Sequence, residues 1–159
     1  MSSRQGLEGR IQKRLLELGG TLATAESCSG GLLAHRITNV PGSSEYYLGG
    51  VVTYSNRAKT SLLRVRKSDL AEWGAVSEPV ARQMAEGVRR RFGADFGIGI
   101  TGIAGPGGDT VEKPVGLVYI AIAGAAGTVV KRNRFAGTRE AIKDLCADKA
   151  LRMLLEYLG

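Results

Sequence analysis

The chain has 159 residues, of which 43% are hydrophobic and 23% are charged, so it can build a folded core. We expect residues 1–159 to form a single domain. The most apolar run, residues 117–126, is about half as long as the ~18 residues of a membrane span, and the polar N-terminus is unlike a signal peptide. These features predict a cytoplasmic protein with no membrane partner.

Charge and cysteine content restrict the partners and cofactors. The excess of 22 Lys and Arg over 15 Asp and Glu gives a net charge of +7, which suits a phosphate-bearing partner, either a small nucleotide or a polymer. Aromatic residues are only 6%, too few for a base-stacking surface, so nucleic acid is disfavoured. Cys28, Cys146 and the single His35 cannot form a four-ligand zinc site, and we expect two free thiols and no metal.

Hydrophobic periodicity and turn residues predict alternating helices and strands. A first helix carries Leu7, Ile11, Leu15 and Leu18 and ends at two glycines. The next expected elements are a strand over 21–25, a helix over 29–38, a strand over 48–54, and short helices over 58–63 and 67–73. A helix capped by Ser77 ends near residue 93, and strands follow over 96–101, 115–123 and 128–135. Thr138 caps a final helix with Ile142, Leu145, Met153, Leu154 and Tyr157 facing inward.

This order of elements predicts the fold class. Five strands interleaved with helices are typical of a three-layer α/β/α sandwich. The early strand–helix–strand units favour parallel pairing, whereas the late hairpin requires at least one antiparallel strand. We therefore expect an α/β fold with one mixed, mostly parallel five-stranded sheet.

The segment Glu-Ser-Cys-Ser-Gly-Gly at 26–31 lies where the first strand passes into a helix. Such a turn lies at the carboxyl edge of the sheet and directs the free N–H groups of the helix at a ligand. Ser27 thus has the position of a nucleophile, although the G-x-S-x-G motif is absent, and Gly30 and Gly31 would admit a ligand. The alternative is that Ser27 or Ser29 only caps the helix.

A nucleophilic serine needs a base. His35 lies eight residues further along the same helix, about 9–12 Å away, which excludes a Ser-His-Asp triad. Tyr54 and Lys59 follow the second strand and would flank the same sheet edge as Ser27. A basic lysine must be neutral, so its pKa must fall from about 10.4 toward about 7–8, through burial and like charge such as Arg57. The alternative is a solvated helix lysine.

The segment 97–108 is rich in glycine. Gly97, Gly99 and Gly102 spell G-x-G-x-x-G, but the first two lie within a strand and no helix follows, so we interpret the match as accidental. The loop after this strand suits backbone amides that bind an anion, a lid, or a plain mobile connection. Asp109 and Glu112 could bind Mg²⁺, but acids in an exposed loop usually hold no ion.

Six motifs stand in order along the chain: TAESCSGG at 24–31, GVVTYSNRAK at 50–59, GAVSEP at 74–79, TGIAGPG at 101–107, KPVG at 113–116 and FAGTR at 135–139. Together they closely resemble the nicotinamide-nucleotide amidohydrolase family, which is also the C-terminal domain of the competence/damage-inducible protein CinA. The resemblance runs from about residue 10 to residue 158. It implies hydrolysis of the carboxamide of nicotinamide mononucleotide to nicotinic acid mononucleotide and ammonia, in pyridine-nucleotide salvage.

The resemblance also implies an α/β/α sandwich with a mixed five-stranded sheet, no metal, a bacterial cytoplasm and a homo-oligomer. By position, Ser27 would be the nucleophile, Lys59 its base and Tyr54 an assisting group. The residues expected to bind the substrate are Cys28, Gly30, Gly31, Thr101, Gly102, Gly105 and Arg139. Ser29 stands where the family usually has Thr, and Asp109 where many relatives have Gly.

Two alternatives come from other classes of function. A non-enzymatic CinA-like module, linked to competence or DNA damage, would bind nucleic acid or protein, but the presence of both Ser27 and Lys59 favours an enzyme. A pyrophosphatase acting on ADP-ribose is associated with the N-terminal half of full-length CinA. Neither that half nor an acid-rich metal-binding helix is found in this sequence, so this activity is not expected.

Overall fold

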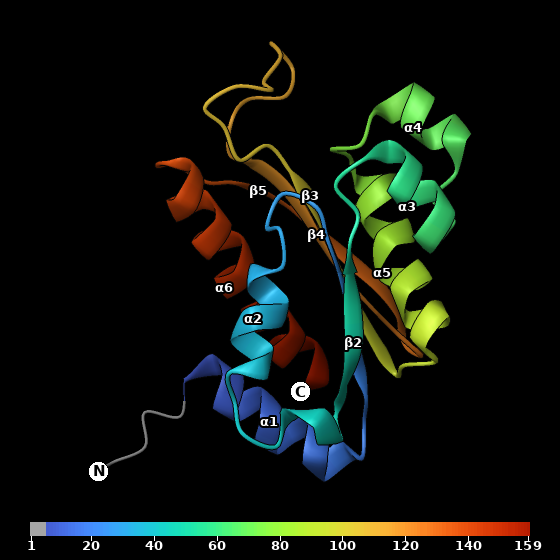
Figure 1. Ribbon diagram of the computed structural model, residues 1–159, viewed down its shortest axis with the longest axis vertical. Helices are drawn as coiled ribbons and strands as arrows, with labels where there is room; N and C mark the ends of the chain where they lie inside the picture. The colour runs from blue at the N-terminus through green and yellow to red at the C-terminus, as the bar shows by residue number, and fades with distance from the viewer. Residues whose placement is uncertain (1–5) are drawn as a thin grey trace.

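The computed structural model describes residues 6–159, which form a five-stranded sheet between two layers of helices (Figure 1). The elements in chain order are α1 (Leu7–Leu18), β1 (Leu22–Glu26), α2 (Leu32–Thr38), the 3₁₀ turn η1 (Ser43–Glu45), β2 (Tyr47–Val52), α3 (Asn56–Leu63), α4 (Lys67–Trp73), α5 (Glu78–Phe92), β3 (Phe96–Gly102), β4 (Leu117–Gly124), β5 (Gly127–Arg134) and α6 (Arg139–Leu158).

The sheet has the strand order β2-β1-β3-β4-β5. β1 pairs in parallel with both β2 and β3, whereas β4 is antiparallel to β3 and β5. A two-residue turn joins β4 to β5, and so short a connection permits only antiparallel pairing. The predicted α/β/α fold with a mixed, mostly parallel sheet is confirmed, with β4 alone running against the other strands.

Different side chains fill the two sides of the sheet. Helices α1, α2 and α6 cover one face, and α5 covers the other with α3 and α4 beside it (Figure 1). The first side buries mainly large aliphatic residues, including Ile11, Leu15, Leu33, Ile98, Ile120 and Leu151. The α5 side buries many small ones, including Ala23, Ala25, Ala81, Ala85 and Ala121. Helix α5 therefore lies close to the strands.

The glycines of β3 make this close approach possible. A Cβ atom on Gly97 would lie 2.3 Å from the carbonyl oxygen of Ala85, and one on Gly99 would lie 2.6 Å from that of Ala81. These separations are far below van der Waals contact, so only glycine fits against the α5 backbone. Gly97 and Gly99 thus serve helix–sheet packing, a role that the sequence analysis did not predict when it interpreted the G-x-G-x-x-G match as accidental.

Two local predictions were wrong. Helix α2 begins at Leu32 and not at residue 29, because Gly30 and Gly31 adopt the left-handed φ values of 60° and 101° and keep the chain in a turn. Leu145 is 39% exposed because it lies beside the buried stripe of α6, which includes Ile142 and Cys146.

The predicted helix caps differ in how they act. Thr138 caps α6 as expected, since its side chain accepts a hydrogen bond from the Ala141 N–H. Ser77 occupies the N-cap position of α5, but its hydroxyl donates to the carbonyl oxygen of Gly74 instead. Within residues 6–159, none of the helices has the length and apolar character needed to cross a membrane.

We expect Gly99→Ala to destabilise the fold by about 1–3 kcal/mol, because the added methyl group must push α5 away from β3. Urea unfolding followed by circular dichroism measures this loss. Gly107→Ala is the matched control, since a Cβ at Gly107 meets no heavy atom within 4 Å. Equal midpoints for the two variants would contradict the packing argument.

Candidate functional site

The nucleophile and base candidates meet at the carboxyl edge of the sheet. Glu26 is paired with Val52 in the β1–β2 register, so the segments that follow the two strands leave the sheet side by side. Lys59 Nζ lies 2.9 Å from Ser27 Oγ. Ser27 is 9% exposed and Lys59 only 2%. A buried amine in hydrogen-bond contact with a serine hydroxyl has the geometry of a base and its nucleophile.

The amine of Lys59 has a second, fixed partner. Nζ donates to the carbonyl oxygen of Thr53 at 2.7 Å. Burial lowers the pKa of Lys59 from its ordinary value of 10.5, and the neighbouring Cys28 partly opposes this shift. Arg57, whose charge we expected to contribute, is exposed to solvent. The lowered pKa therefore comes from burial, which favours the neutral amine that a base requires.

Glu26, immediately before Ser27, is a buried carboxylate that sequence reasoning did not assign. Its Oε1 accepts from the Ser29 hydroxyl at 2.7 Å and from the Leu33 N–H at 2.9 Å, and its Oε2 accepts from the Ala34 N–H at 3.1 Å. We expected the first turn of α2 to offer these N–H groups to a ligand. Glu26 binds them instead, so the start of α2 is capped from within the protein.

A cavity of about 290 Å³ opens over this pair. It is lined by Ser27, Cys28, Tyr54, Asn56, Lys59, Ala75, Val76, Thr101, Gly102, Ile103, Ala104, Gly105, Gly107, Gly108 and Arg139. The lining includes both members of the Ser–Lys pair and most of the residues expected to bind substrate. Sequence reasoning missed Asn56, Ala75 and Val76, although all three lie within the motifs at 50–59 and 74–79.

Arg139 joins three segments around this cavity. Its Nη2 donates to the Tyr54 hydroxyl at 2.6 Å, and its Nη1 donates to the carbonyl oxygen of Gly105 at 2.7 Å. Tyr54 is thus held by Arg139, and its assisting role toward the base stays a prediction. Thr101 donates its hydroxyl to the carbonyl oxygen of Ala75 at 2.9 Å, which joins two further segments of the cavity lining.

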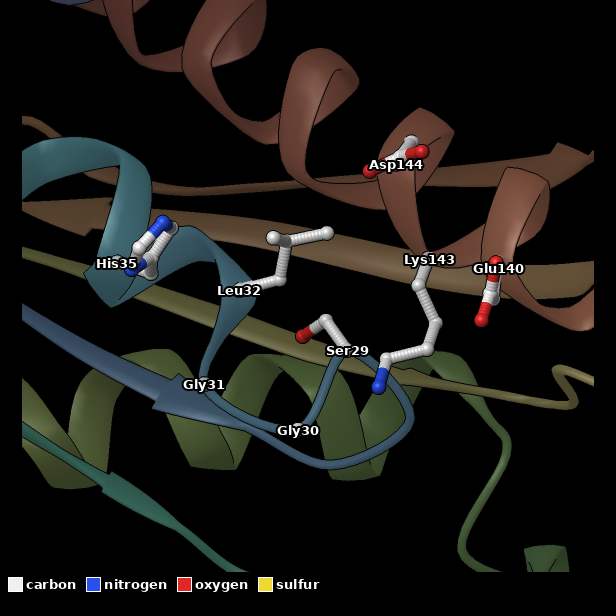
Figure 2. Close-up of a pocket in the computed structure, with 8 residues that line it drawn as sticks. All are labelled: Ser29, Gly30, Gly31, Leu32, His35, Glu140, Lys143 and Asp144. Atoms are coloured by element: carbon white, nitrogen blue, oxygen red, sulfur yellow. The ribbon is translucent and has the colours of Figure 1, made fainter.

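Gly30 and Gly31 line a different hollow, of about 470 Å³, between α2 and α6. Figure 2 shows the side chain of Lys143 extending from α6 toward the turn at Gly30. The Gly30 N–H donates to the carbonyl oxygen of Ser27, so it is not free for a ligand. The expected substrate contacts of Gly30 and Gly31 stay predictions. His35 lines the same hollow and is exposed, which agrees with its exclusion as the base.

The two cysteines are free thiols and lie together in the core on the α6 side of the sheet. A hydrogen bond between them lowers the pKa of Cys28, against the effect of burial, and raises the pKa of Cys146. Elsewhere, Asp109 and Glu112 are exposed in the loop between β3 and β4. In the part of the chain that the structure describes, no three His, Cys, Asp or Glu side chains gather in a way that could hold a metal ion.

Comparisons with known proteins cover nearly the whole chain. The family model described as CinA C-terminal domain matches residues 4–158. A curated protein of Moorella thermoacetica, whose name refers to competence damage, is 60% identical over 138 residues, 87% of this chain and 33% of its own length. A "CinA-like protein" of Gloeothece citriformis is 52% identical over 151 residues, 93% of this chain and 36% of its own.

A solved structure covers the same region. The crystal structure of the competence/damage inducible protein CihA from Agrobacterium tumefaciens has a TM-score of 0.91 and 39% identity, with all of both chains covered. The curated relatives are longer, since this chain spans about a third of their length.

The lowered pKa of Lys59 predicts how stability changes with pH. Between the folded pKa of Lys59 and its unfolded value near 10.5, the unfolded chain binds more protons, so the contribution of Lys59 to stability rises with pH. Relative to Lys59→Met, the wild-type protein should gain free energy of unfolding as the pH rises from 7 to about 10. Urea unfolding across this range tests it, with Lys67→Met, an exposed lysine, as control. Parallel curves for the wild type and Lys59→Met would refute the prediction.

Proposed function

The chain belongs to the CinA C-terminal domain family, and from this premise we propose that it hydrolyses the carboxamide of nicotinamide mononucleotide to nicotinic acid mononucleotide and ammonia. The observation that carries the proposal is the contact of 2.9 Å between Ser27 Oγ and the buried Lys59 Nζ. In this scheme Ser27 is the nucleophile and Lys59 the general base of a metal-independent amidase in pyridine-nucleotide salvage.

The reaction divides into two proton-balanced steps. Ser27 Oγ attacks the carboxamide carbon while the neutral Lys59 takes its proton. The C–N bond then breaks, Lys59 gives that proton to the departing nitrogen, and ammonia leaves a nicotinoyl ester on Ser27. Water attacks the ester, Lys59 takes one proton of the water and returns it to Ser27 Oγ, and the acid product releases its remaining proton to solvent to give the carboxylate.

The negative oxygen of each tetrahedral intermediate needs a hydrogen-bond donor, typically worth about 3–4 kcal/mol. The Ser27 N–H is engaged with the carbonyl oxygen of Ile100, and the Gly30 N–H with that of Ser27. Cys28 follows the nucleophile and lines the cavity. Its N–H is therefore our candidate for the oxyanion donor of the turn.

The nucleotide portion of the substrate carries a phosphate. Arg139 lies in the cavity wall, and its two hydrogen bonds join Tyr54 to the loop at Gly105. We propose that this group binds the nucleotide together with the backbone from Thr101 to Gly105. Homo-oligomer formation and a cytoplasmic location belong to the same proposal, and they rest on the resemblance.

Ser27→Ala should abolish ammonia release from nicotinamide mononucleotide, because it removes the nucleophile, while nucleotide binding survives. An ammonia assay with added chelator and no added metal, run beside calorimetric titration of the nucleotide, measures both. Equal loss of activity and binding would refute the nucleophile assignment. No ammonia release from folded wild-type protein would favour the alternative, a CinA-like binding module linked to competence or DNA damage.

The wall formed by Arg139 predicts a difference in KM. Arg139→Met should raise KM for the nucleotide about tenfold or more, because it removes a charge-assisted contact, while Tyr54→Phe, which removes only one neutral partner of Arg139, should have a smaller effect. Steady-state ammonia release tests both variants. A larger loss of kcat in Tyr54→Phe than in Arg139→Met would instead assign Tyr54 to proton transfer.

A further inference from the structure

Glu26 is a buried charged group that the reaction scheme does not use. Its side chain is 1% exposed, and it is absent from the lining of the catalytic cavity. Buried carboxylates are rare because burial removes their hydration, and they persist where hydrogen bonds replace it. Glu26 accepts three hydrogen bonds that supply this replacement, and all three donors belong to the segment that follows Ser27.

These contacts close the nucleophile turn upon itself. The hydroxyl of Ser29 returns to the Glu26 carboxylate at 2.7 Å, and the Gly30 N–H donates to the carbonyl oxygen of Ser27 at 3.0 Å. The N–H groups of Leu33 and Ala34 attach the first turn of α2 to the same carboxylate. Both ends of the turn, with Ser27 and Cys28 between them, are therefore tied to a single side chain.

The backbone of Glu26 is also connected to the base. Its carbonyl oxygen accepts the Thr53 N–H at 2.8 Å, and the carbonyl oxygen of Thr53 accepts Lys59 Nζ at 2.7 Å. The position of Glu26 is thus coupled to both partners of the Ser–Lys contact. A shift of about 1 Å between reacting groups can cost about a hundredfold in rate, so such coupling bears directly on turnover.

From these contacts we propose that Glu26 is a positioning residue, whose carboxylate holds the Ser27–Gly31 turn so that Ser27 Oγ stays in contact with Lys59 and the Cys28 N–H stays in the cavity wall. This inference rests on the proposed function. Charge-assisted hydrogen bonds from three donors give the carboxylate the strength that the role requires.

The decisive variant is Glu26→Gln, which keeps the size of the side chain. In the wild type, both carboxylate oxygens of Glu26 accept hydrogen bonds. The amide of Gln has only one acceptor oxygen, so its NH₂ group replaces the other oxygen and faces a hydrogen-bond donor. Ser29→Ala removes only one of the three contacts. Val88→Ala is the control, because Val88 is fully buried in the core on the α5 side and shortening it destabilises the protein without touching the turn.

Two readouts separate positioning from general stability. The first is ammonia release from nicotinamide mononucleotide, in which Glu26→Gln should lower kcat by about 10–100-fold and leave KM nearly unchanged. The second needs no nucleotide: the rate at which a small alkyl fluorophosphonate labels Ser27, followed by mass spectrometry, should fall by a similar factor. Ser29→Ala should lower kcat and the labelling rate by a smaller factor, and Val88→Ala should match the wild type in both readouts.

The results distinguish failure of the positioning role of Glu26 from failure of the proposed function. Wild-type rates in folded Glu26→Gln, or equal losses in Glu26→Gln and Val88→Ala, would overturn the role of Glu26 and leave the proposed function intact. If the wild-type protein shows neither ammonia release nor labelling of Ser27, the proposal that Ser27 is an activated nucleophile is itself refuted. If Glu26→Gln does not fold, Ser29→Ala carries the test, and unchanged kcat and labelling there would overturn the inference.

Discussion

The candidate site depends on one buried amine. Lys59 lies between a backbone carbonyl oxygen and the Ser27 hydroxyl, almost without solvent contact. An ammonium group in such a place loses most of its hydration, whereas a neutral amine loses little, so burial favours the form that can take a proton. The fold provides this setting by placing Ser27, after β1, and Thr53, after β2, against the side chain of Lys59 in α3.

Parallel strand pairing brings Ser27 and Lys59, the candidate nucleophile and base, together. Because β1 and β2 lie side by side and in the same direction, the turn that carries Ser27 and the segment that carries Lys59 leave the sheet at one edge. The glycines of β3 contribute from the next strand, since they admit α5 against the sheet and the loop beyond them lines the cavity. Packing of the core and construction of the site thus depend on the same three strands, β1, β2 and β3.

The nucleophile turn shows where local patterns mislead. Hydrophobic periodicity after the first strand predicted a helix starting at residue 29, with its first N–H groups open to a ligand. Instead the carboxylate of Glu26 reaches those N–H groups, and left-handed glycines delay the helix to Leu32. No local pattern predicted these hydrogen bonds to Glu26. Glu26 lies at the end of a strand, and its three donors come within reach only once the turn has folded back.

The sequence by itself determined the order of helices and strands and the α/β class, and it singled out Ser27 and Lys59 as the candidate nucleophile and base. Periodicity and turn residues are local properties that can be identified in the sequence. The six motifs, each at its own position, together give the resemblance to one family. Only the tertiary structure decided that Gly30 and Gly31 line a separate hollow, that burial rather than Arg57 lowers the pKa of Lys59, and that Glu26 caps α2. The physical reason is that burial, hydration and hydrogen-bond partners depend on how the chain folds back on itself, which one-dimensional patterns do not show.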